Sequence, residues 1–348
     1  MQFVQSAFGV QSDYTFTEIG LSSLGNIKIF DFACESGGKP PCVNGDLIGP
    51  FGPLAVLLSL FIPLSIALFF SIAYKLKTKD LIKAREGTKS LEEEFTNSLF
   101  ILGNRLGEGI PAEIAFSKVA ESTRGLKTER FFSIVNQNIQ ELGLSLESSI
   151  FDKRRGAITF FPSSLISTSM KILVESVKKG LQVAARSLMS ISDYVKNIQK
   201  INQRLRDLLA EVVSDMKSNM TFLAPLLAGV VIGLSAMITI ILTKLQDIQS
   251  LSGEDTGAFS FSSIINIFNS KAMIPPYFLQ IVIGIYIIEI IFILTSALVT
   301  VDSGKDPLKE KYDLSRFLKS GISLYLITSF ISILALAILA YVSLSGLG

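Results

Sequence analysis

Residues 90–125 have the sequence SLEEEFTNSLFILGNRLGEGIPAEIAFSKVAESTRG. Ser90 and Glu93 stand in the register of a capping box, which predicts that a helix begins at Leu91. Apolar residues then recur every three or four positions, which predicts one buried helix face. The residues of this face are Leu91, Phe95, Leu99, Leu102 and Leu106.

A turn and a second helix follow. Gly107 and Gly109 interrupt the first helix, and Pro111 suits the first position of the next one, because its missing N–H would have no intrahelical partner there. The apolar face continues in the second helix with Ile114, Ala115 and Val119. The stretch therefore predicts a helical hairpin.

The composition indicates a membrane protein with a soluble domain. Of the 348 residues, 49% are hydrophobic and 18% are charged, and the chain has no His and only two Cys. These counts exclude a metal cluster of familiar ligand spacing and remove the commonest general base. We therefore expect no catalytic residue, no metal and no cofactor.

The sequence also excludes a phosphate-binding loop and gives little support to a nucleic-acid surface. Gly304 and Lys305 are followed by Asp306, and Val299 stands where a phosphate-binding loop needs its first Gly. The basic helices lack aromatic residues interleaved on their charged faces, so we expect no nucleic-acid partner.

Four apolar stretches are long enough to cross a bilayer as helices. We expect these spans at residues 51–74, 221–244, 276–300 and 321–345. Pro63, near the middle of the first span, is a site where a kink is expected. The remaining chain divides into an outer segment, a soluble helical domain, an outer loop and a basic loop, at residues 1–50, 75–220, 245–275 and 301–320.

The cations are distributed unevenly. Residues 75–220 hold 23 of the 32 Lys and Arg and residues 301–319 hold 5, which predicts that both segments face the cytoplasm and both termini lie outside the cell membrane. The expected fold is an all-α membrane protein with four transmembrane helices and a cytoplasmic six-helix bundle.

The last helix of this bundle is long and begins at Leu181. Its apolar residues form a nearly continuous seam, which is typical of packing against partner helices. They are Ala184, Leu188, Ile191, Val195, Ile198, Ile201, Leu205, Leu208 and Val212. Residues 216–221 contain no helix breaker, so the helix can continue into the second span.

Four ordered motifs carry a resemblance to a known family. They are GNRLGEGIPAEIA (103–115), FFSIVNQNIQELGLSLESSIFD (131–152), VESVKKG (174–180) and FLAPLLAGVVIGL (222–234). Over roughly residues 52–345 the chain resembles the type II secretion system F-domain family, and more closely its archaeal branch, the membrane platform proteins of type IV pili and the archaellum. The resemblance implies a six-helix cytoplasmic bundle without enzymatic activity.

The resemblance also implies partners. Members of the family are scaffolds on which a hexameric secretion ATPase acts to extract pilin or archaellin subunits from the lipid bilayer, and a homo-oligomer is expected. Archaeal members usually carry two such domains, and only one is seen here, so the chain corresponds either to a C-terminal half or to a short member. A membrane signalling receptor with a helical cytoplasmic domain is the alternative function.

Two groups of residues have both a functional and a plain structural interpretation. The hairpin motif can be a contact point or pivot, or simply a tight turn; its residues are Gly107, Glu108, Gly109, Pro111 and Glu113. Two cationic sets can dock the ATPase, or can reflect membrane topology and anionic headgroups. These sets are Lys153, Arg154 and Arg155, and Lys309, Lys311 and Arg316.

Glu289 lies close to the centre of the third span, where a carboxylate costs roughly 2.5–3.5 kcal/mol. It can receive the positively charged N-terminus or a polar group of a pilin helix. Alternatively, a protonated Glu289 bonds to Tyr286 or to a Ser or Thr of a neighbouring helix. In the outer segment, Cys34 and Cys42 either form a disulfide or remain free thiols.

Overall fold

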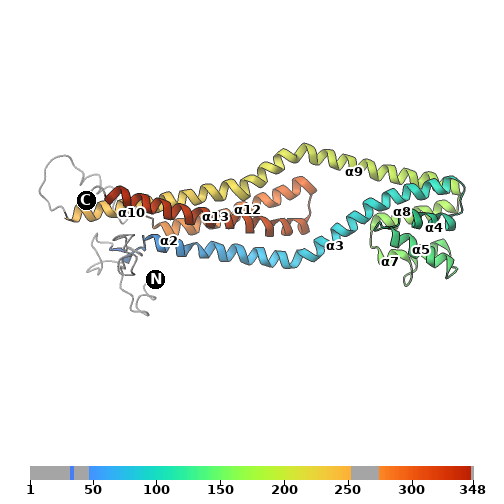
Figure 1. The fold of residues 1–348 in the computed structure, drawn as a ribbon, viewed down its shortest axis with the longest axis horizontal. Helices are drawn as coiled ribbons and strands as arrows, with labels where there is room; N and C mark the ends of the chain where they lie inside the picture. Colours follow the sequence, from blue (N-terminus) through green and yellow to red (C-terminus); the bar gives the residue numbers. More distant parts are fainter. Residues whose placement is uncertain (1–31, 35–46, 252–273, 346–348) are drawn as a thin grey trace. The chain divides into compact units, whose positions relative to one another are not determined.

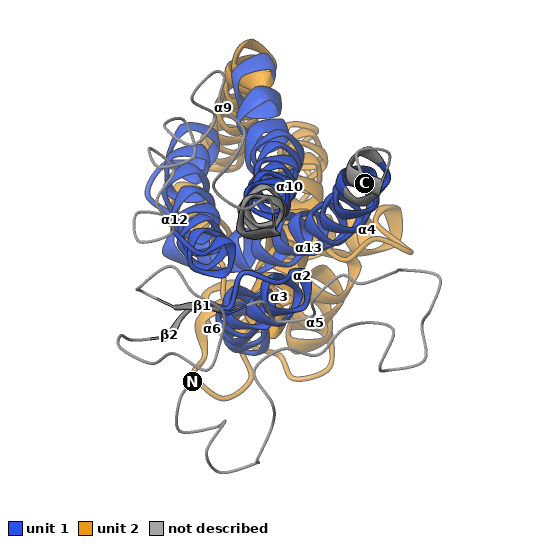
Figure 2. Ribbon diagram, turned by 90° about the vertical axis from the view of Figure 1, so that its left-hand side faces the viewer, with its two compact units in different colours: residues 1–77, 211–348 blue, residues 78–210 orange. Residues whose placement is uncertain are grey.

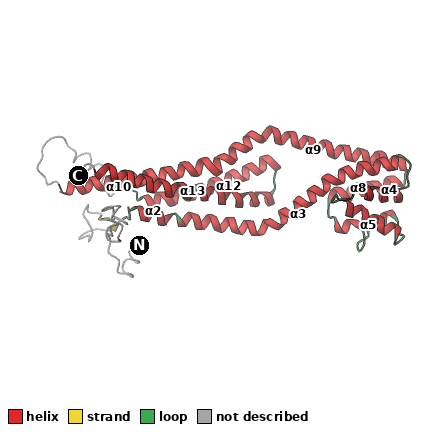
Figure 3. Cartoon of the chain, viewed as in Figure 1, coloured by secondary structure: helices red, strands yellow, loops and turns green. Residues whose placement is uncertain are grey.

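The computed structural model describes residues 32–34, 47–251 and 274–345, which are almost entirely helical (Figures 1 and 3). Turns connect the helices, and two short strands, β1 (Ala33–Cys34) and β2 (Leu47–Ile48), pair antiparallel. The chain forms two compact units, residues 1–77 with 211–348, and residues 78–210 (Figure 2). We call them unit 1 and unit 2.

Most of the predicted outer segment and outer loop, and Cys42 with the predicted disulfide, lie outside the described residues.

Unit 1 contains the apolar helices. They are α2 (Pro53–Ser59), the start of α3 (Phe61–Gly107), α10 (Ala224–Leu251), α12 (Pro276–Ser303) and α13 (Pro307–Ser345). Among the described residues, four helices are long and apolar enough to cross a membrane, in agreement with the four predicted spans. This arrangement is compatible with a multi-pass membrane protein.

The first span is interrupted near Pro63, as predicted. Helix α2 ends at Ser59 and α3 begins at Phe61, with Leu60 between them. Pro63 has no N–H to donate to the Ser59 carbonyl four residues earlier, and its ring crowds that carbonyl. The break therefore falls where the sequence removes one helical hydrogen bond.

Helix α3 does not begin at Leu91. It runs without interruption from Phe61 to Gly107, so the prediction from the capping box is wrong. A capping box stabilises a helix end only where the chain before it is not helical. Residues 75–89 contain no Pro, and ten of the fifteen are Lys, Leu, Arg, Ala or Glu, which favour helix, so the helix continues through Ser90.

Glycines set the closest helix contacts in unit 1. A Cβ at Gly229 would lie 2.2 Å from Thr328 Oγ1, and one at Gly233 would lie 1.9 Å from Ser332 Oγ. The two glycines form a GxxxG motif on α10, which lets its backbone approach that of α13. The lack of a side chain at these positions is therefore a packing requirement.

A short π-helix, η2 (Asn219–Leu223), joins α9 (Leu181–Ser218) to α10. Pro225 accounts for it, because a Pro inside an α-helix cannot bond to the carbonyl four residues earlier and crowds it. A wider turn, in which the N–H of Ala224 bonds to the Asn219 carbonyl, accommodates the ring. The helix nevertheless continues from Leu181 to Leu251, as the sequence allowed.

The basic segment predicted as a loop is mostly helical. Only residues 304–306 separate α12 from α13. Asp306 Oδ1 accepts a hydrogen bond from the backbone N–H of Lys309 at 3.2 Å, and Pro307 has the preferred φ of a first helical residue. The cations after residue 306 therefore lie on the first turns of α13.

Unit 2 is described throughout and has seven helical segments rather than the six predicted. Between the end of α3 and the start of α9 come α4 (Ala112–Ser122), α5 (Glu129–Gln140), α6 (Leu146–Phe151), α7 (Ala157–Phe160) and α8 (Ser164–Val177). The extra segment is α7, which is only 4 residues long. A turn at residues 152–156 separates it from α6.

The core of unit 2 includes the face predicted on residues 91–106. All five of its apolar residues are buried, four of them completely, so this prediction is confirmed. The centre of the core is a group of aromatic rings in which the centroid of Phe132 lies 5.3–5.8 Å from those of Phe95, Phe116 and Phe131. Such edge and stacked pairs stabilise a core beyond simple area burial.

Candidate functional site

The predicted hairpin joins α3 to α4. Helix α3 ends at Gly107, and Pro111 is the N-cap of α4 rather than its first residue. Gly109 has a φ of 82°, which glycine adopts without strain. The carbonyl of Gly107 accepts a hydrogen bond from Gln182 Nε2 of α9 at 2.9 Å. These contacts give the glycines and the proline a structural role in the turn.

The polar residues of the hairpin remain exposed. Glu108 pairs with Arg105 at 3.1 Å on the surface, where such a pair contributes little stability. Glu113 lies in the first turn of α4, where a negative charge is favourable. Ala115 and Val119 are fully buried as predicted, but Ile114 is 48% exposed. Any contact made by this hairpin is therefore expected to involve Glu108, Glu113 and Ile114.

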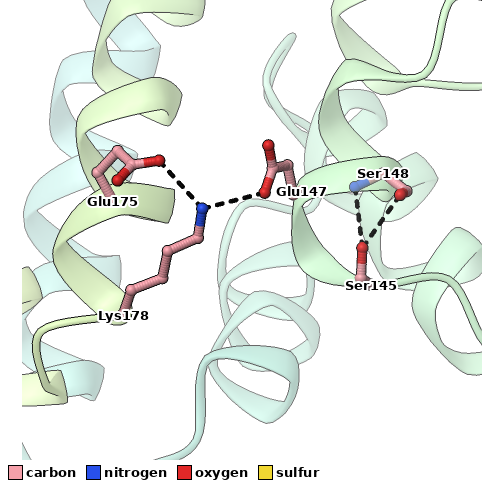
Figure 4. Close-up of polar contacts among 5 residues, drawn as sticks. All are labelled: Ser145, Glu147, Ser148, Glu175 and Lys178. Carbon is pink, nitrogen blue, oxygen red and sulfur yellow. Dashed lines mark hydrogen bonds and ion pairs between the residues drawn. The ribbon is translucent and has the colours of Figure 1, made fainter.

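Two of the family-like motifs meet at Lys178 (Figure 4). Its Nζ lies 3.0 Å from Glu175 Oε1 and 3.2 Å from Glu147 Oε2, and these hydrogen bonds raise the pKa of Lys178, with Glu175 contributing most. Ser145 caps α6 by accepting a hydrogen bond from the Ser148 N–H at 3.2 Å. The contacts connect the start of α6 to the end of α8.

The first cationic set lies in an ordered turn between α6 and α7. Asp152 Oδ1 accepts the backbone N–H of Arg154 at 2.7 Å, and Asn138 Nδ2 donates to the Arg155 carbonyl at 2.8 Å. The side chains of Lys153, Arg154 and Arg155 are exposed, and no acid among the described residues forms an ion pair with them. The turn thus presents three positive charges that form no ion pair within the described residues.

The second cationic set lies in unit 1, and its members differ. Lys309 Nζ is paired with Asp302 and hydrogen-bonded to Ser303 Oγ at 2.6 Å. Lys311 and Arg316 are exposed on α13. Intrachain contacts therefore occupy one of the three predicted docking cations, and the two sets belong to different units.

Glu289 lies near the midpoint of the 28-residue helix α12, and its side chain is exposed on unit 1. Among the described residues the carboxylate has no hydrogen bond or ion pair, and neither Tyr286 nor a neighbouring Ser or Thr bonds to it. Tyr286 is itself 59% exposed. The internal partner considered from the sequence is therefore absent from the described residues.

Only the first turns of the seam predicted on α9 are covered within the chain. Ala184 and Leu188 are fully buried, and Ile191 packs against the core of unit 2. Farther along, four large apolar side chains are 40–78% exposed. We call this surface the α9 stripe, and it consists of Ile198, Ile201, Leu205 and Leu208.

Sequence reasoning missed the GxxxG pair on α10, although its signal, AGVVIG at residues 228–233, is present in the sequence. Comparisons with models of protein families, with curated proteins and with solved structures found no match to this chain. A functional assignment therefore depends on the sequence motifs together with the arrangement of these surfaces.

Proposed function

We propose that this chain is a non-enzymatic platform in the cell membrane. In this proposal it couples a cytoplasmic secretion ATPase to the extraction of pilin-like subunits and to the assembly of an archaeal type IV pilus-like filament or an archaellum. The four ordered motifs support the proposal, and three of them lie in unit 2. The uneven distribution of cations supports a topology with unit 2 in the cytoplasm and both termini outside.

The observation that carries the proposal is the continuity of two helices. Helix α3 runs from the first apolar stretch to the hairpin at Gly107, and α9, η2 and α10 follow one another without a break from Leu181 to Leu251. Each turn of such a helix is held by backbone hydrogen bonds, so a displacement at one end is transmitted along the axis. A platform that passes force from a motor to a membrane segment needs this property.

The turn at residues 153–155 is the best docking site for the ATPase. The positive-inside rule accounts for Lys and Arg within about 15–20 residues of a membrane span, and this turn lies much farther from either neighbouring span. Its three charges are exposed and have no acidic partner among the residues that the structure describes. Opposite charges on a partner would accelerate association and fix its orientation.

Glu289 is a contact for the extracted subunit. A carboxylate at mid-membrane depth without an internal partner costs roughly 2.5–3.5 kcal/mol, which a partner carrying a positive charge or a hydrogen-bond donor would offset. A pilin helix whose amino terminus or polar side chain reaches this depth would fit. Exposed Tyr286, three residues earlier on α12, adds a hydroxyl group close by in sequence.

The α9 stripe is a self-association surface for a second copy of the chain. The stripe consists of Ile198, Ile201, Leu205 and Leu208, which follow the alternating three and four spacing of a coiled-coil seam. Two copies of this seam would match each other, in agreement with the expected homo-oligomer.

Copurification tests the proposal. The full-length protein would be isolated in mild detergent from its own cells, alongside a variant with Lys153, Arg154 and Arg155 changed to Glu. The matched control changes three exposed cations on other helices of unit 2, Lys118, Arg130 and Lys171, to Glu. We expect the ATPase to elute with the wild type and the control and to be lost from the variant; elution of a signalling kinase instead would favour the receptor.

A further inference from the structure

Unit 1 contains a basic groove of about 780 Å³ between α3, η2 and α13. One face of α13 forms most of its wall, with lining residues recurring every three or four positions from Tyr312 to Ile327. Ser71 and Lys75 of α3 lie on the other side, and Thr221 and Phe222 of η2 complete the lining. The Ser71 hydroxyl donates to the Ser315 carbonyl at 2.7 Å, which fixes α3 against α13 beside the groove.

The chemistry of the groove changes along α13. Near the start of the helix the groove is basic, because Arg316 and Lys319 line it there and α3 adds Lys75. Ser320 and Ser323 follow, and the wall then becomes apolar at Leu324 and Ile327. The span from Tyr312 to Ile327 is about 22 Å along a helix, enough for a headgroup and a stretch of acyl chain.

The three cations are available to a ligand. None of the residues that line the groove is acidic, and no acid among the described residues forms an ion pair with Lys75, Arg316 or Lys319. All three side chains are exposed. A guanidinium and two ammonium groups beside hydroxyl groups are the donors that bind a phosphate.

The groove also lies at the membrane depth of a headgroup. Lys75 directly follows the first apolar stretch, Phe222 begins the second, and Lys319 precedes the fourth, so three ends expected on the same side of the membrane meet here. Phe222 is 54% exposed and adds apolar surface beside the cations. Basic pockets between membrane helices at the depth of the headgroups bind anionic lipids.

We propose that this basic groove binds one anionic phospholipid, with its phosphate at Arg316, Lys319 and Lys75 and an acyl chain along Leu324 and Ile327. The lipid would join α3, η2 and α13, and thereby the junction at which α9 passes into the membrane helix α10. The inference rests on membrane insertion of unit 1 and not on the role in filament assembly, so either can fail without the other.

The test is native mass spectrometry of the full-length protein in non-ionic detergent, titrated with phosphatidylglycerol or phosphatidylcholine. Two pairs of variants are compared, R316Q/K319Q with K305Q/K311Q, and K75Q with K77Q. Both members of a pair lose the same charge, but only the first lines the groove. The substituted side chains are exposed, and the helical circular dichroism of each variant verifies its fold.

We expect one tightly bound phosphatidylglycerol, bound roughly 30-fold more weakly by R316Q/K319Q and about 5-fold more weakly by K75Q, with wild-type binding in both controls. Equal weakening in groove and control variants would show general surface attraction and overturn the proposal. So would equal affinity for phosphatidylcholine, which carries the same phosphate but no net charge, because it would show that the groove does not select anionic lipids. Displacement of the lipid by millimolar inorganic phosphate would identify a site for the anion alone and also overturn it.

Discussion

Replacement of Phe132 by Ala tests the core on which unit 2 depends. The Phe132 side chain is fully buried, and its ring centroid lies 5.8 Å from Phe95, 5.8 Å from Phe116 and 5.3 Å from Phe131. Removing a buried Phe leaves a cavity and costs about 3–5 kcal/mol. Because these rings come from α3, α4 and α5, we expect all three helices to lose stability together.

Hydrogen exchange of the full-length protein measures this loss. A change of 3–5 kcal/mol raises the exchange rate of the most protected amides about 10²–10⁴-fold when exchange follows unfolding of the unit. The control is Phe160→Ala, at a Phe that is 53% exposed on α7, and it should change the rate by less than about threefold. Equal effects of the two substitutions, or no effect of Phe132→Ala on residues 91–106, would refute the aromatic core.

Four further substitutions test other features of the account. Gly233→Ile should prevent the close approach of α10 and α13, because a Cβ there would lie 1.9 Å from Ser332 Oγ, and it should lower the melting temperature of the protein in detergent. Gly87→Ala, at a helical glycine with nothing within 4 Å of the position that a Cβ would take, should instead stabilise the fold by about 0.5–1 kcal/mol. Glu289→Gln should reduce the number of filaments at normal protein level, and an unchanged number would remove the proposed contact with the subunit. Leu205→Glu should shift the protein toward monomer in analytical ultracentrifugation, and an unchanged mass would exclude the α9 stripe as the interface.

The sequence predicted those features that depend on local pattern. The apolar face at residues 91–106, the turn at residues 107–111 and the start of α9 at Leu181 follow from helical periodicity and from Gly and Pro, which act within a few residues. The four apolar helices follow from length and composition.

The features that were missed depend on neighbours that a pattern does not specify. Ser90 and Glu93 can form a capping box only at a helix end, and the helix-favouring residues before them keep α3 continuous. The seam on α9 has the same spacing where it is buried and where it is exposed, because periodicity does not state whether the covering partner belongs to the same chain. Counts of Lys and Arg indicate a membrane side but do not distinguish the loop predicted at residues 301–320 from the helix α13.

The central claim, that unit 2 is the surface on which a secretion ATPase acts, is tested most directly by crosslinking in growing cells. Arg154 would be replaced by a photoreactive benzoylphenylalanine, with exposed Lys171 on α8 replaced in the same way as control, and crosslinked partners would be identified by mass spectrometry. We predict that illumination joins position 154 to the secretion ATPase, and position 171 to it much less. Crosslinks from position 154 to a signalling kinase, or to no ATPase at equal expression, would contradict the proposed function.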